Sequence, residues 1–303
     1  MTLEVSMKTL LSMLVGGVLV AAPVFPQSKN AVKTATRQVF VSVLDRSGAP
    51  VLDLHPADFH LTETGVPREV VRAGLAKSPM RVVLLVDNSD AVGPALNFLR
   101  AGLLAFLDTL PPEHEVMIVS TGRQLRVRVP PTLDRKKLND IANGLFTDGG
   151  AGSMLIDSLL EIDDRFLKKA DDRWPVFVII SSDGVETSAG AHEKQFNQWS
   201  LAMAGRGIIA HAIVLKFKGN GGLPEMVAMN VTENSGGHYD FINTGNSLPD
   251  KMKALASLMA DDYKQASMKY QVEYATDSKE WKPVEVAVAR DGVRVQVSQG
   301  RLR

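Results

Sequence analysis

The sequence predicts an α/β protein in which a doubly wound, mostly parallel sheet is joined to a smaller β module. Three observations carry this prediction. Residues 82–86 and 176–180 are continuous apolar runs, which is typical of parallel strands buried on both faces. Helix-periodic segments alternate with further strands between and after these runs. With 303 residues, 45% of them hydrophobic, the chain is long enough for one large domain and a smaller one.

The N-terminal residues have the pattern of a secretory signal peptide. Lys8 precedes an apolar run over 10–24 that ends in small residues. Glycines interrupt this run, and it is shorter than the roughly 20 residues that a membrane-spanning helix needs. A cleaved signal over 1–27, cut between Ala21 and Ser28, is therefore favoured over a permanent anchor. We expect an exported protein, periplasmic or secreted, with no membrane span after cleavage.

The segment 37–76 is β-rich and contains no catalytic cluster. A turn at Thr64-Gly65 separates two of its short strands. The alternation of apolar and polar residues predicts strands at 39–44, 59–62 and 70–72.

The segment 80–268 alternates strands with helices, as a doubly wound sheet requires. After the apolar run at 82–86, strands are predicted at 116–119, 125–129 (an edge strand), 176–180, 208–215 and 238–241. Helices are predicted at 94–110, 134–143, 154–170, 193–204, 224–234 and 249–268.

The segment 269–303 is β-rich again, with strands predicted at 269–274, 284–289 and 293–297. Arg290-Asp291-Gly292 lies between the last two, and an Asp-Gly pair in that place predicts a β-hairpin. Neither terminal β segment is large enough to hold a core alone. We therefore predict that 37–76 and 269–303 pair into one module from which the α/β domain emerges.

The charge balance and the cysteine count exclude several classes of protein. Lys and Arg together number 34, as do Asp and Glu, so the formal net charge is zero. No broad basic surface of the kind that nucleic-acid binding needs is expected. The chain has no cysteine, which excludes disulfides, thiolate metal sites and a cysteine-linked lipid anchor.

Polar residues follow the ends of two predicted buried strands. The sequence Asp-Asn-Ser-Asp-Ala at 87–91 follows one, and Ser-Ser-Asp-Gly at 181–184 follows the other. A glycine-rich loop over 149–153 precedes a helix. Ligands of open α/β sheets bind at the carboxyl ends of the strands, near the point where the strand order reverses. Oxygen donors without histidine or sulfur predict a hard cation there, Mg²⁺ or Mn²⁺.

These motifs resemble the von Willebrand factor A (vWA) domain, which has a strand ending in Asp-x-Ser-x-Ser, a Gly-Gly-Thr before a helix, and a later Ser-Asp-Gly. The resemblance covers roughly 80–268 and includes the turn at 234–239 before the last strand. It implies a Rossmann-like fold with a metal-ion-dependent adhesion site. The flanks, 39–65 above all, are similar to the exported vWA-related proteins of acidobacteria.

Matched to the family motif, four residues of this sequence would hold the metal. Asp87 and Ser89 stand at the first two positions of the motif, Ser153 stands at the threonine position, and Asp183 is the later acid. The departure is Ala91, because a methyl group cannot replace the second serine of the motif as a ligand. We expect metal binding to be weakened or lost.

A further acid, Asp90, is adjacent to the missing ligand and is a possible accessory group. Neighbouring loop residues point in different directions, so it need not take the place of the serine.

The resemblance implies an adhesion or protein-binding module and not an enzyme. Its partner would be a protein or cell-surface ligand whose acidic residue completes the coordination of the cation. One alternative is that Asp87 and Asp183 only cap helix N-termini and hold the loops. Another is a metal-independent envelope scaffold that uses the β module or helix faces for assembly. A Mg²⁺-dependent phosphohydrolase is disfavoured, because Ser89 stands where such an enzyme needs a second acid.

Two tryptophans are assigned structural places. Trp199 lies at core-like spacing with Phe196 and Met203 in a predicted helix, so we expect it in the core. Trp174 precedes a buried strand and is predicted to be a partly exposed lid over the top edge of the sheet.

Overall fold

A computed structural model describes residues 35–150, 152–168, 172–188, 190–217, 222–278 and 280–299. The predicted signal peptide over 1–27 lies outside these residues.

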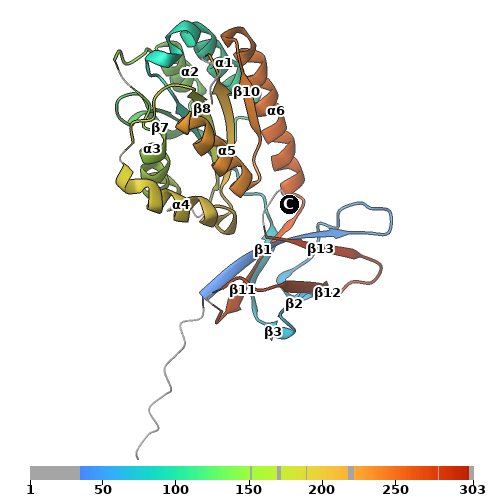
Figure 1. The fold of residues 1–303 in the computed structure, drawn as a ribbon. Helices are drawn as coiled ribbons and strands as arrows, with labels where there is room; N and C mark the ends of the chain where they lie inside the picture. The colour runs from blue at the N-terminus through green and yellow to red at the C-terminus, as the bar shows by residue number, and fades with distance from the viewer. Residues whose placement is uncertain are drawn as a thin grey trace, which may run out of the picture. The chain divides into compact units, whose positions relative to one another are not determined.

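The α/β domain is built on a six-stranded sheet in the order β10-β9-β8-β5-β6-β7 (Figure 1). All neighbours pair in parallel except β6 and β7, which are antiparallel. The predicted edge strand is therefore confirmed at β7. The strands are β5 (Met80–Val86), β6 (Glu115–Ser120), β7 (Arg126–Thr132), β8 (Trp174–Ser182), β9 (Ile209–Leu215) and β10 (Tyr239–Ile242).

The strand order reverses between β5 and β8. From β5 the chain first builds outward to β6 and β7, then returns to place β8 on the other side of β5. Leu84 of β5 is aligned with Ile118 of β6 and with Val178 of β8. The carboxyl ends of β5 and β8 therefore lie side by side at a topological switch point, where α/β sheets bind ligands.

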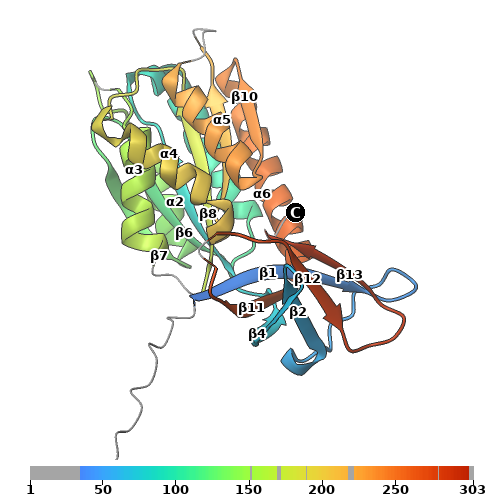
Figure 2. The ribbon, with the colours of Figure 1, turned by 60° about the horizontal axis from the view of Figure 1, so that its bottom comes forward.

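Helices cover both faces of this sheet (Figure 2), and each face has its own apolar core. Asp134 caps one of these helices, α2, by accepting a hydrogen bond of 3.0 Å from the backbone N–H of Lys137. One face is covered by α1 (Leu96–Thr109), α2 (Arg135–Asn143) and α6 (Leu248–Ala266). The other is covered by α3 (Leu155–Ile162), α4 (Glu193–Ala202) and α5 (Leu223–Ser235).

Two of the predicted helices have irregular ends. The helix predicted at 94–110 is preceded by a 3-10 turn, η2 (Asp90–Ala95), that contains Pro94. The helix predicted at 154–170 continues from α3 into a π turn, η3 (Asp163–Leu167).

One stretch is more apolar than the sequence analysis expected. Among the described residues, Asp90–Thr109 is long and apolar enough to cross a membrane by length and composition alone. Its α1 part buries Leu99, Leu103 and Phe106 completely in the core. Burial against α6 and the sheet accounts for its apolar character.

The two ends of the chain pair in antiparallel sheets. β1 lies between β11 and β13, and β2 pairs with β12, so 35–75 and 270–298 share one core. This confirms the predicted fold class, with its terminal β segments. One sheet has the order β13-β1-β11-β4, from β13 (Arg294–Ser298), β1 (Ala35–Leu44), β11 (Tyr270–Thr276) and β4 (Val70–Leu75). The other has the order β12-β2-β3, from β12 (Val284–Val288), β2 (Phe59–Glu63) and β3 (Val66–Arg68).

The two turns predicted in the β segments have different outcomes. Thr64 and Gly65 both have positive φ, 51° and 77°, and join β2 to β3 as a two-residue hairpin. The hairpin predicted at 290–292 is wrong, because β12 pairs with β2 and β13 pairs with β1. Gly292, at φ 71°, turns the chain from one sheet into the other.

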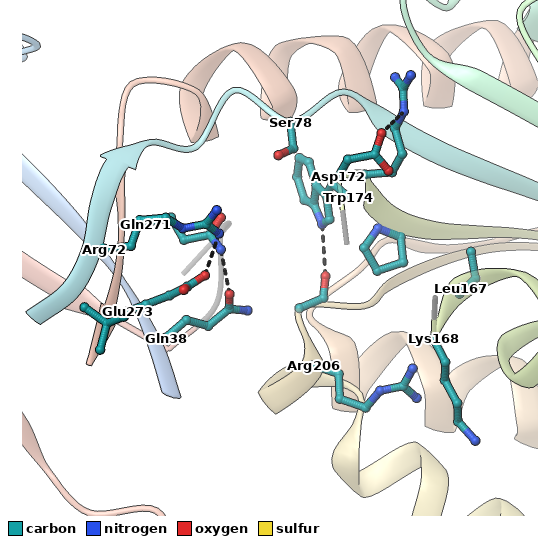
Figure 3. Close-up of a pocket in the computed structure, with 14 residues that line it drawn as sticks. Gln38, Arg72, Ser78, Leu167, Lys168, Asp172, Trp174, Arg206, Gln271 and Glu273 are labelled. Atoms are coloured by element: carbon teal, nitrogen blue, oxygen red, sulfur yellow. Dashed lines mark hydrogen bonds and ion pairs between the residues drawn. The ribbon is translucent and has the colours of Figure 1, made fainter. Parts of the chain in front are cut away.

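The two tryptophans also differ. Trp199 is buried with Phe196 and Met203, as predicted. Trp174 is only 2% exposed and begins β8, so it lies at the amino end of the strand, away from the switch point. Its indole Nε1 donates to the carbonyl of Gly207 at 3.0 Å, beside a groove that Figure 3 shows. The prediction of an exposed lid over the top edge is therefore wrong.

Candidate functional site

Asp87 is the first residue after β5 and is 2% exposed. Its Oδ1 accepts from the backbone N–H of Ser89 at 2.8 Å, and its Oδ2 accepts from the hydroxyl of Ser182 at the end of β8. Its own N–H donates to the carbonyl of Ile180 at 2.8 Å. Asp87 therefore fastens the loop after β5 to the end of β8 across the switch point.

Ser89 is 1% exposed and precedes the turn η2. At this position a serine hydroxyl commonly accepts a hydrogen bond from the start of the helix. Here it does not, and the buried Oγ has no hydrogen-bond partner among the described residues. An unpartnered buried hydroxyl costs about 1–3 kcal/mol, and a bound cation is one partner that would offset this cost.

Ser153 is brought to the same edge by the loop before α3. Its hydroxyl lies 2.9 Å from that of Thr121, and both side chains are 1% exposed. The N–H of Thr121 donates to the carbonyl of Val86 at 3.0 Å, which places this pair beside the end of β5. Ser153 itself is held by its N–H, which donates to the carbonyl of Val185 at 2.7 Å.

The helix that follows Ser153 has an acidic cap. Glu186 accepts from the N–H of Leu155 at 3.0 Å, at the first residue of α3. Burial raises the pKa of the Glu186 carboxyl, opposed by its hydrogen bonds from Ser188 and the α3 backbone. A negative charge at a helix N-terminus is favourable, so this cap fixes the loop that carries Ser153.

Asp183 follows β8 directly and is 7% exposed. Its N–H donates to the carbonyl of Leu215 at 2.9 Å, which extends the pairing of β8 with β9. Gly184 comes next, and a Cβ built there would lie 2.8 Å from the methyl carbon of Ala91 and 3.7 Å from Ser89 Oγ. The methyl group of Ala91 therefore occupies the space between the two loops, where the family motif has a second serine.

Asp90 is turned away toward the glycine-rich loop, where its carboxylate accepts from the N–H of Gly150 at 2.5 Å. Its role is to order that loop.

Asn88, which the sequence analysis did not single out, ties three loops together. Its Oδ1 accepts from the N–H of Gly122 at 2.8 Å, and its Nδ2 donates to the carbonyl of Phe146 at 3.0 Å. A Cβ at Gly122 would lie 2.7 Å from Asn88 Oδ1 and 3.0 Å from the nitrogen of Ser89. Only glycine allows this close approach.

The donor set fits a hard cation with one ligand missing. Two carboxylates, Asp87 and Asp183, lie at the switch point with the hydroxyls of Ser89 and Ser153, and all of these donors are oxygens. The unpartnered hydroxyl of Ser89 is the observation that favours a metal. No cluster of three or more His, Asp or Glu side chains suited to a metal occurs in the described part of the chain. Hydroxyl ligands are therefore essential to any site here.

The hydroxyl groups of Thr121 and Ser182 contact the predicted ligands Ser153 and Asp87; the sequence analysis named Ser182 only within the segment 181–184 and did not name Thr121. Ser182 is the last residue of β8 and Thr121 follows β6, and no spacing in the sequence indicates which side chains they contact.

Comparison with known proteins agrees with this fold. Residues 82–186 match the von Willebrand factor type A domain family. The chain contains a vWA domain. The matched residues run from β5 to just past Asp183, and therefore include all four predicted ligands. By sequence, the chain matches no curated protein.

Solved structures similar to this one include other vWA proteins. The von Willebrand factor type A protein of Catenulispora acidiphila aligns over 90% of this chain and 74% of its own, with a TM-score of 0.52 and 10% identity. At that identity the similarity shows the fold alone. BatB of Bacteroides thetaiotaomicron covers 60% of this chain and 99% of its own (TM-score 0.47, 16% identity). An aerotolerance-related membrane protein of Bacteroides fragilis covers 59% and 100% (TM-score 0.43, 16% identity).

Proposed function

We propose that this chain is an exported protein-binding module whose vWA domain holds Mg²⁺ or Mn²⁺ through Asp87, Ser89, Ser153 and Asp183. The cation would supply a positive charge and an open coordination position for an acidic residue of the partner. vWA domains in general mediate protein–protein contacts, which supports a binding function. The observation that carries the proposal is the buried hydroxyl of Ser89, which lacks a hydrogen-bond partner in the described residues.

The surrounding residues prepare the site in two ways. Hydrogen bonds from the Ser182 hydroxyl and the Ser89 N–H fix both oxygens of Asp87, so the loop needs little rearrangement on binding. The loops on either side are held by backbone contacts of Asn88 and Ser153. A partner therefore meets a preorganised surface, which lowers the entropic cost of association.

The residue two positions after Asp87 argues against a phosphohydrolase. An enzyme of that kind needs a second acid there, beside its nucleophilic aspartate, to act as general acid or base. This chain has Ser89 at that position.

The test is a calorimetric titration of Mn²⁺ and Mg²⁺ into the chelator-treated protein. The wild type is expected to bind, and Ser89→Ala is expected to bind at least tenfold more weakly, because it loses a ligand oxygen. Since the hydroxyl of Ser89 has no partner among the described residues, this variant should not lower the melting temperature. Asp87→Ala removes a charged ligand and should abolish the heat, whereas Asp108→Ala on the exposed side of α1 should change nothing.

Two outcomes contradict the metal site. One is the absence of heat and of any metal-dependent shift in melting temperature for the wild type. The other is binding that survives unchanged in Ser89→Ala and Asp87→Ala. Either would leave the metal-independent envelope scaffold as the function to pursue.

A further inference from the structure

The first turns of α5 expose apolar side chains next to the candidate site. Leu223 is 46% exposed, Met226 60% and Met229 40%, although the inner side of the same helix is buried in the core through residues such as Val227 and Val231. A surface helix is ordinarily polar on its outer side. α5 is apolar on both sides over these turns.

These side chains form one surface with a residue of the site loop. Residues three apart on a helix are neighbours, so Leu223, Met226 and Met229 are continuous. A Cβ at Gly222 would lie 3.6 Å from the carbonyl oxygen of Gly184, which brings the start of α5 against the loop after Asp183. The apolar strip consists of four residues: Val185, Leu223, Met226 and Met229.

Val185 connects this strip to the predicted ligands. Its side chain is 65% exposed, while its carbonyl accepts the 2.7 Å hydrogen bond from the N–H of Ser153. The exposed apolar surface therefore begins at the rim of the candidate metal site.

Two charged groups beside the strip, Glu225 and Lys216, are paired with each other. Glu225, the one acid between Leu223 and Met229, is 8% exposed and bonds to Lys216 Nζ at 3.0 Å and to the Tyr239 hydroxyl at 2.8 Å. Among the described residues next to the strip, Lys216 is therefore engaged, and the strip itself suits apolar side chains of a protein.

We infer that the apolar strip is a specificity surface for a partner protein in which apolar side chains adjoin the acidic residue. The inference rests on the proposed function, because the metal site fixes where the acid lies. Exposed apolar surface that is continuous with a binding site marks a contact surface. The flexible, polarisable side chains of Met226 and Met229 can adapt to aliphatic or aromatic groups.

A peptide library with a fixed central glutamate and randomised flanks, displayed on phage, tests this on the full chain in Mn²⁺. Enriched sequences are expected to carry Leu, Ile, Met or Phe close to the glutamate. A synthetic peptide from that set should bind Met226→Ser roughly tenfold more weakly than wild type, since burying one methionine is worth that much. Leu201→Ser is the matched control, because Leu201 is 75% exposed near the C-terminal end of α4, outside the strip.

The outcomes separate this inference from the proposed function. The inference would be overturned by enriched peptides without apolar flanks, or by equal peptide binding to Met226→Ser and wild type. If that binding is still lost in chelator, the proposed metal site stands. Apolar peptides that bind equally in chelator but fail with Met226→Ser would uphold the strip and overturn the metal-dependent function. No enrichment at all would overturn the inference. As a control, Met226→Ser must bind Mn²⁺ as wild type does in calorimetry, so that its loss of peptide binding can be assigned to the strip.

Discussion

Among single residues, Ala91 bears most directly on the affinity of the site for a cation. Its methyl carbon lies beside Gly184 and close to Ser89, where the family motif supplies a serine oxygen. Ala91→Ser adds one oxygen donor without removing any contact. We expect roughly tenfold tighter Mn²⁺ binding, because affinity at such sites rises with the number of ligands.

The measurement is the Mn²⁺ titration of Ala91→Ser beside wild type and Ala101→Ser. Ala101 is exposed on α1, so its serine adds a hydroxyl at a distance from the site and should leave the affinity unchanged. An equal affinity in Ala91→Ser and wild type would show that position 91 does not face the cation.

Residue types at strand ends made part of this site predictable. Asp87 and Asp183 could be located because each follows a continuous apolar run, and parallel strands bring their carboxyl ends to one edge. The roles of Asn88 and Thr121 could not be found, because they depend on which loops approach each other in three dimensions. The direction in which Asp90 points was also beyond the sequence.

At the scale of elements, an ion pair with a buried carboxylate joins η3 to Arg206, in the 3-10 turn η5 (Ala204–Arg206) that follows α4. Asp163 is 1% exposed and accepts two hydrogen bonds from Arg206, at 2.5 and 2.7 Å, and one from Trp199 Nε1 at 2.8 Å. Arg206→Met leaves this carboxylate buried without its counter-charge. We expect a loss of about 3 kcal/mol in the free energy of unfolding, measured by urea denaturation.

Arg165→Met is the control for this prediction. Arg165 pairs with Glu161 at 2.6 Å, but both side chains are about half exposed, at 48% and 49%. Such a surface pair contributes less than about 1 kcal/mol. Equal losses in the two variants would show that burial does not decide the strength of the Asp163 pair.

Most elements could be predicted from periodicity, and the exceptions have a common physical cause. Helical spacing continues through η3, so nothing in the pattern distinguishes a π turn from an α-helix. The hairpin at 290–292 had the right turn residues, yet β12 and β13 found partners in different sheets. Short-range signals specify a turn, whereas strand partners are chosen by long-range packing.

At the scale of the whole molecule, the layered fold was predictable because a sheet with a hydrophobic core on each face needs strands that are apolar on both faces. The inner strands β5, β6, β8 and β9 each contribute to both cores, which requires mostly apolar runs. The pairing of 35–44 with 270–276 was predictable only from the argument that neither end could form a core alone. The division of the β segments between two sheets was not, because their alternating patterns are all alike.

Two buried histidines make the stability of the vWA domain depend on pH. Burial lowers the pKa of both His114 and His211 to about 4. At His114 the charge of Glu113 opposes this shift, whereas Arg135 and Arg173 add to it. At His211 the charge of His238 adds to it. Both rings accept a backbone hydrogen bond at Nδ1 of 3.1 Å, from Met80 and from His238.

In the unfolded chain a histidine takes up a proton below its ordinary pKa of about 6.5, whereas in the folded protein His211 takes one up only near pH 4. The stability from keeping His211 neutral is therefore fully present above pH 6.5 and is lost as the pH falls toward 4, by about 3 kcal/mol. Melting temperatures at pH 7.5, 5.5 and 4 should show this loss, and His211→Asn, which keeps an acceptor for the His238 N–H, should show a smaller one. The melting temperature of His60→Asn, a change at an exposed position, should fall with pH as steeply as that of wild type. An unchanged slope in His211→Asn would assign the acid sensitivity to other groups, His114 first among them.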